Sequence, residues 1–211
     1  TGFEWGYGGS GPAQLALASG YLYALTGGQQ VVQLRILDPG NPQRPQVGFS
    51  SLSNVLGHAD QQALAVSSNA VFVVTAGYDG NALGVYTPLG QPWNPTLLGA
   101  SLFAEGTPHR VVVDGGYVYV ANGGAGLKIF DVSDLAHPAP TNQFFTAVQA
   151  NSVVLQGNLA YVMDINTGFH ILDVSDPTSP VSLGAYESPN GAAAIAVKSH
   201  FVYLALNAPP T

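Results

Sequence analysis

Two stretches of the chain align without a gap and decide its fold. Residues Gly115–Pro138 read GGYVYVANGGAGLKIFDVSDLAHP, and residues Gly157–Pro180 read GNLAYVMDINTGFHILDVSDPTSP. The second stretch begins 42 residues after the first. Both contain a tyrosine, a glycine before an apolar run, and a DVSD motif after that run. A fixed period of this length predicts an architecture that stacks copies of one structural unit.

The period extends beyond these two copies. Tyr203 lies 42 residues after Tyr161, and Tyr23 and Val73 hold the same place in two earlier copies, where insertions lengthen the spacing. Because 211 residues fit one domain, we expect a single domain spanning 1–211. Its five repeat units have approximate boundaries 11–53, 54–104, 105–145, 146–187, and 188–211 together with 1–10.

Each unit has the pattern of β-strands joined by turns. In the third copy, Val111–Val113 is a β-branched run, Asp114–Gly116 is a tight turn, and Tyr117–Val120 is a second strand. Leu127–Phe130 and the more polar Thr141–Phe145 complete four antiparallel strands. No window shows the 3.6-residue apolar period of a helix. The sequence therefore predicts an all-β fold, a β-propeller of five four-stranded blades.

The two ends of the chain suggest how such a ring closes. Gly2–Tyr7 matches the outer-strand piece Gly184–Glu187, and Phe201–Leu206 is a second strand of the last unit. We expect the N-terminal and C-terminal strands to pair in one sheet, which removes an exposed edge. The third strand of that sheet is unaccounted for. We favour a chain that continues beyond Thr211; the alternatives are a strand from a partner, an imperfect closure, or a larger ring.

The strings GLKIFDVSD and GFHILDVSDPTSP, with the tyrosine strand before each, resemble the LVIVD repeat family. The resemblance covers residues 105–187 well, 11–50 and 188–206 in part, and 51–104 weakly. It implies a β-propeller-like fold in bacterial or archaeal proteins, many of them exported or located at the cell surface. It implies no catalytic residues, because the family has none established.

Composition excludes several classes of protein. Charged residues make up 8% of the chain, with twelve acidic residues against five basic ones, and there is no cysteine. The chain therefore has no disulfide and no Cys-ligated metal or cluster. No apolar run reaches the length of a membrane span. We expect no nucleic-acid partner, because no basic stripe forms from the five scattered cations Arg35, Arg44, Arg110, Lys128 and Lys198.

The compartment follows from the composition. The chain opens on Thr1 and carries no signal peptide, so we expect a leader to have been removed or left out of this sequence. Few Lys and Glu residues, many Gly, Asn, Gln, Ser and Thr residues, and the absence of Cys are typical of extracellular or cell-surface proteins.

Three aspartates recur at the end of the third strand of a unit: Asp38, Asp131 and Asp173. A ring of carboxylates for Ca²⁺ is one reading. Repetition in successive units favours the other reading, in which each carboxylate accepts backbone N–H groups of its own turn. No histidine lies in a metal-binding spacing, and we expect neither a metal nor a cofactor.

The function that fits best is a non-enzymatic scaffold that binds partner proteins or copies of itself, since sparse surface charge leaves large surfaces free to associate. One alternative is a carbohydrate-binding propeller with aromatic pockets between its blades. Another is a glycoside hydrolase with Glu105 and Asp60 at the axial mouth. The candidate ligand or partner contacts are Trp5, Tyr78, Trp93, His58 and His109.

Overall fold

The computed structural model describes nine segments of the chain. They are residues 15–18, 21–28, 31–37, 46–52, 61–77, 80–87, 95–144, 149–188 and 191–206. Every regular element in these segments is a β-strand, and none of them contains a helix. The all-β prediction is therefore confirmed. The chain divides into two compact units, residues 1–104 with 134–138 and residues 105–133 with 139–211.

Unit 1 contains two four-stranded antiparallel sheets in which each strand pairs with the next along the chain. Sheet 1 consists of β1 (Leu15–Ala18), β2 (Tyr21–Gly28), β3 (Val31–Leu37) and β4 (Gln46–Leu52). Sheet 2 consists of β5 (Gln61–Val66), β6 (Val71–Gly77), β7 (Gly80–Tyr86) and β8 (Leu97–Phe103).

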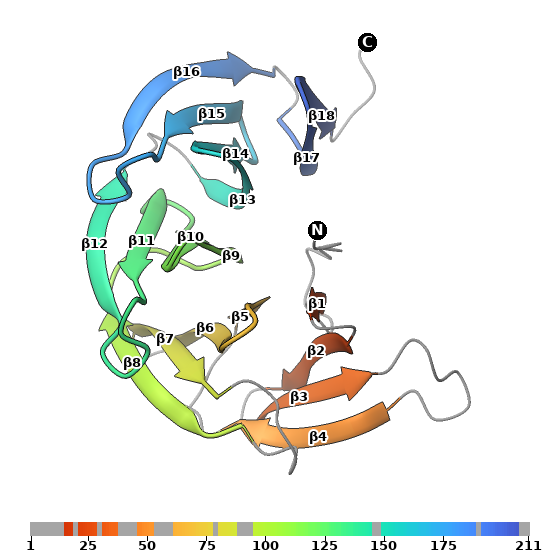
Figure 1. Cartoon of the computed structure of the whole chain (residues 1–211). Coiled ribbons are helices and arrows are strands. Elements are labelled where there is room, and N and C mark those ends of the chain that lie inside the picture. The colour runs from red at the N-terminus through yellow and green to blue at the C-terminus, as the bar shows by residue number, and fades with distance from the viewer. Residues whose placement is uncertain are drawn as a thin grey trace. The chain divides into compact units, whose positions relative to one another are not determined.

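Unit 2 contains two more four-stranded sheets of the same order and one two-stranded sheet (Figure 1). Sheet 3 consists of β9 (Arg110–Asp114), β10 (Tyr117–Ala121), β11 (Leu127–Asp131) and β12 (Ala139–Phe144). Sheet 4 consists of β13 (Ala150–Gln156), β14 (Leu159–Asp164), β15 (Gly168–Asp173) and β16 (Val181–Glu187). Sheet 5 consists of β17 (Ala194–Lys198) and β18 (Phe201–Ala205).

Glycines at the turns explain why the strands pair in chain order. Gly115 and Gly116 join β9 to β10 with φ of 55° and 83°, values that glycine adopts without the steric penalty of a side chain. Two residues with positive φ form a turn whose twist matches that of antiparallel strands. Such a short connection brings Asp114 opposite Tyr117, which sets the register of the whole pair.

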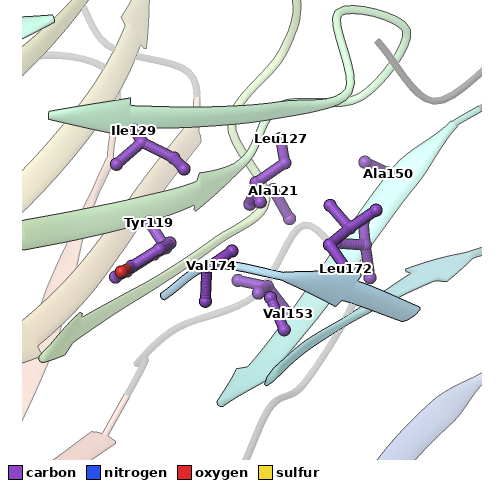
Figure 2. Close-up of a cluster of buried hydrophobic side chains, with 10 residues drawn as sticks. Tyr119, Ala121, Leu127, Ile129, Ala150, Val153, Leu172 and Val174 are labelled. Carbon is purple, nitrogen blue, oxygen red and sulfur yellow. The ribbon is translucent and has the colours of Figure 1, made fainter. Parts of the chain in front are cut away.

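Sheets 3 and 4 bury a shared apolar layer. One face of sheet 3, which we call the tyrosine face, carries Tyr119, Leu127 and Ile129, all nearly or fully buried. It packs against Val153 and Leu172 on the opposite face of sheet 4 (Figure 2). Burial raises the pKa of Tyr119 to about 12. The tyrosine repeated along the sequence is therefore a core residue of the seam between these two sheets.

Backbone hydrogen bonds join the sheets of unit 2 at one end of the seam. The N–H of Gly123 donates to the carbonyl of Ala150 at 2.9 Å, and the N–H of Ala150 donates back at 3.0 Å. Forty-two residues further on, the N–H of Ala192 donates to the carbonyl of Ile165 at 3.4 Å. The contact between one sheet and the start of the next therefore repeats with the period of the sequence.

The outer strands meet the turn that follows the next DVSD motif. Thr141 on β12 donates its hydroxyl to the carbonyl of Pro177 at 3.5 Å. Within unit 1, Gly99 on β8 holds the repeat position equivalent to that of Thr141. A Cβ built on it would lie 2.6 Å from the carbonyl oxygen of Leu135 and closer still to that of Ala136. Gly99 is thus required by close packing of this turn against the strand.

We predict that Leu172→Ala lowers the free energy of unfolding by about 2–4 kcal/mol, because it removes a fully buried side chain from the seam. Leu183→Ala is the matched control in the same sheet, since Leu183 is 59% exposed. The control should stay within about 0.5 kcal/mol of the wild type. Urea denaturation followed by circular dichroism measures both, and equal losses in the two variants would contradict the packing described.

Candidate functional site

The DVSD motif folds into two consecutive turns closed by side chains. Asp131 accepts a hydrogen bond at Oδ1 from the N–H of Ser133 at 2.8 Å, and Asp173 does the same with Ser175 at 2.8 Å. The second aspartate of the motif makes the same kind of contact: Oδ1 of Asp176 accepts a hydrogen bond from the N–H of Thr178 at 2.9 Å. These are the turn contacts that a structural role requires.

Hydrogen bonding stabilises the charged form of these carboxylates. The N–H of Ser133 lowers the pKa of Asp131, and the N–H of Ser175 lowers the pKa of Asp173. The hydrogen bond from His137 to Asp134, 2.9 Å long, lowers the pKa of Asp134. The hydroxyl of Thr178 lowers the pKa of Asp176. Each of these carboxylates therefore uses an oxygen to close its own turn.

His109 is the candidate contact that the structure describes. It lies just before β9, and its N–H donates to the carbonyl of Ala121 at 2.9 Å. Burial lowers the pKa of His109, which favours the neutral imidazole. The other candidates lie outside the described residues: Trp5, Tyr78, Trp93 and His58, together with the turn residue Asp38.

Of the two acids considered for hydrolysis, the structure describes one. Glu105 is exposed in the loop before β9, and Asp60 lies outside the described residues. Among the described residues, no group of three or more His, Cys, Asp or Glu side chains could hold a metal ion. No helix in those segments is long and apolar enough to cross a membrane.

Two buried polar residues at equivalent repeat positions were not identified from the sequence. Asp164 is 1% exposed, and its Oδ1 accepts from the N–H groups of Asn166 and Thr167 at 2.7 and 3.0 Å. Asn122, fully buried, donates its amide to the carbonyl of Glu105 at 2.8 Å. The remaining oxygen of each has no partner among the described residues. Their 42-residue spacing was the available signal, but both resemble ordinary turn residues.

The features with the clearest capacity for binding are exposed apolar side chains on one strand of each unit, β16 in unit 2 and β8 in unit 1. All residues of β16 are exposed, and they include Val181, at 56%, and Leu183, at 59%. On β8, Leu102 is 65% exposed and Leu97 42%. Large apolar side chains exposed along a strand are typical of interaction surfaces.

Sheet 5 exposes a second apolar surface. Tyr203 is 57% exposed, whereas its repeat equivalents Tyr119 and Tyr161 are 4% and 8% exposed. The ring of Phe201 lies 6.4 Å from that of Tyr203. The tyrosine face, covered in sheets 3 and 4, is therefore open on sheet 5 among the described residues. The candidate interface of unit 2 is therefore the exposed strand β16.

Repeated four-stranded antiparallel meanders define blades of the β-propeller type. Two family models match the chain. The LVIVD repeat matches residues 105–146 and 148–188, one match for sheet 3 and one for sheet 4, and a family of unknown function (DUF6166) matches residues 1–35. Residues 105–146 and 148–188 thus match the LVIVD repeat, as the DVSD strings predicted.

Solved structures resemble the chain in fold. The computationally designed Ika4 protein superposes with a TM-score of 0.60 at 14% sequence identity, covering 75% of this chain and 91% of that one. BamB from Moraxella catarrhalis gives a TM-score of 0.49 at 17% identity, covering 72% of this chain and 39% of BamB. No curated protein matches the sequence.

The lowered pKa values of Asp131, Asp134, Asp173 and Asp176 predict acid sensitivity. A carboxyl whose pKa is lower in the folded protein contributes stability above its unfolded value near 3.8, and that contribution is lost as pH falls through the folded value. Thermal unfolding from about pH 5 to about pH 2 should show a falling Tm.

The double variant Asp131→Asn, Asp173→Asn should flatten this fall, because asparagine retains the acceptor oxygen of the turn but cannot ionise. Asp114→Asn is the control, since it removes an exposed carboxylate from the turn between β9 and β10. An equally steep fall in the double variant and the wild type would refute this account of the turns.

Proposed function

We propose that this protein is a non-enzymatic, extracellular or cell-surface β-propeller scaffold that associates with other protein surfaces, including further copies of itself. The observation that carries the proposal is the exposed apolar side chains on an outer strand of each unit, with Leu102 on β8 of unit 1 and Leu183 on β16 of unit 2 the most exposed. Only 8% of the residues are charged, so few charged side chains interrupt the apolar surface. The extracellular setting is supported by the composition and by the LVIVD repeats.

The propeller we propose has five blades closed into a ring, in which sheet 5 is followed by sheet 1. The exposed tyrosine face of sheet 5 supports this arrangement, because the same face of sheet 3 is covered by the following sheet. In sheet 4, Ala160 precedes Tyr161 and belongs to the face that covers sheet 3. Leu22 precedes Tyr23 in the same way and is the matching residue of sheet 1.

We expect the pair Tyr203→Cys and Leu22→Cys to cross-link within one chain. The native chain has no cysteine, so a short bismaleimide that spans about 10 Å, the distance between packed sheets, reacts only at the introduced sites. Gel electrophoresis and peptide mass spectrometry detect the link. Tyr203→Cys with Leu102→Cys is the control pair. Ring closure is refuted if cross-links form only between two chains, or at the control rate.

Self-association should depend on the apolar side of β16. Sedimentation velocity over about 1–100 μM should show the weight-average coefficient of the wild type rising with concentration. Leu183→Glu should weaken association by at least about tenfold, because it places a charge where an apolar contact forms. Ser182→Glu adds the same charge to the neighbouring exposed position and should have little effect. A wild type that stays monomeric throughout would overturn the self-association proposal.

A further inference from the structure

Asn122 and Gly123, directly after β10, form one of the two Asn–Gly pairs in the sequence; the other is Asn190–Gly191. Asparagine is thermally labile, and a following glycine favours spontaneous deamidation because no Cβ obstructs attack of its nitrogen on the preceding side chain. Glycine is required at position 123, since its φ is 56° and a Cβ would lie 3.1 Å from the carbonyl oxygen of Thr107. The fold therefore fixes this reactive pair in place.

Deamidation replaces an amide by a carboxylate and needs only water. The nitrogen of Gly123 loses its proton and bonds to Cγ of Asn122, and the bond from Cγ to Nδ2 breaks. The leaving nitrogen takes up one proton and departs as ammonia. Water then opens the five-membered imide at either carbonyl and yields aspartate or isoaspartate. The first step therefore needs a Gly123 nitrogen that can lose its proton and an Asn122 amide that can turn toward it.

The fold holds both reacting groups in hydrogen bonds. The N–H of Gly123 donates to the carbonyl of Ala150 at 2.9 Å, so the proton that must leave is bound across the seam between sheets 3 and 4. Nδ2 of Asn122 donates to the carbonyl of Glu105 at 2.8 Å. Asn122 is also fully buried, which keeps it from the water that opens the imide. The reaction therefore requires the junction between Gly123 and Ala150 to open first.

The carboxylate that deamidation produces does not fit this junction. It directs an oxygen at the carbonyl of Glu105, so a hydrogen bond becomes a contact between two acceptors. The equivalent residue of sheet 4, Asp164, accepts at Oδ1 from the N–H of Thr167 at 3.0 Å. In sheet 3 the matching N–H, that of Ala125, donates to the backbone carbonyl of Asn122 at 3.1 Å. Sheet 4 is therefore built for an aspartate at this position and sheet 3 for an asparagine.

We propose that Asn122 is a deamidation site that the folded protein protects and that reacts only when the junction between Gly123 and Ala150 opens. The product hinders the junction from closing again. An aspartate buries a charge beside the carbonyl of Glu105, and an isoaspartate adds a carbon atom to the main chain. The modification thus turns a transient opening into a lasting loosening of the seam. It goes beyond the proposed scaffold function and does not depend on it.

Mass spectrometry of one peptide measures the reaction. Trypsin cleaves after Arg110 and Lys128, and the peptide 111–128 contains Asn122 as its only amide side chain. Its mass gain therefore reports Asn122 without a contribution from Asn190. At mildly alkaline pH the full chain should deamidate at least about tenfold more slowly when folded than when unfolded in guanidinium chloride, because both hydrogen bonds must break first. A smaller difference would overturn the proposed protection.

Hydrogen exchange of the Gly123 amide, followed by NMR, identifies the opening. The same N–H must leave the carbonyl of Ala150 for exchange and for deamidation, so both rates depend on one event. Leu172→Ala, or guanidinium chloride below the unfolding transition, should raise both rates by the same factor. Leu183→Ala, an exposed change in the same sheet, should raise neither. Deamidation that rises without a matching rise in Gly123 exchange contradicts the proposal.

A variant that carries the product from the start tests the effect on the seam. Asn122→Asp should lower Tm, because the buried carboxylate faces the carbonyl of Glu105. Asn158→Asp makes the same change of charge at an exposed position in the turn between β13 and β14 and is the matched control. It should leave Tm close to that of the wild type. Equal Tm values in the two variants would refute the predicted loosening of the seam.

Discussion

The packing of a tyrosine face on the next sheet is the constraint on which unit 2 depends. Successive side chains of a strand point to opposite faces of the sheet. Apolar side chains on both faces therefore cannot be buried by a single sheet alone. Sheet 3 buries Tyr119 and Ile129 against sheet 4, and the backbone bonds between Gly123 and Ala150 hold the seam in register. The sequence period reflects this requirement, because each unit must present the same residues to the sheet that follows it.

Features set by local chemistry could be predicted from the sequence. Leu127–Phe130 was expected as a strand, and β11 spans Leu127–Asp131. The turn at Gly115 and Gly116 followed from the tolerance of glycine for positive φ. The hydrogen bonds that Asp131 and Asp173 make in their turns depend on residues two positions away. Both repeats of the family match were recognisable for the same reason, since their signature is local.

Features set by a neighbour could not be predicted in this way. Tyr203 holds the same repeat position as Tyr119 and Tyr161, yet it is exposed, because burial depends on the sheet that follows and not on the residue. The buried oxygens of Asn122 and Asp164 depend on contacts beyond their own turns. Among the candidate binding residues, only His109 falls within the described segments. Its half-buried position depends on how β9 approaches β10.

The uneven covering of the sheets has a consequence for how unit 2 comes apart. Sheet 3 shares an apolar layer and two backbone bonds with sheet 4, whereas sheet 5 has two strands and one covered face. Partial opening of unit 2 should therefore start at the hairpin β17–β18, because among the described sheets of unit 2 this one has the fewest strands and the least covered apolar surface. Local resistance to opening is thus graded along the chain, and the sheet that presents the exposed tyrosine is also the most easily rearranged.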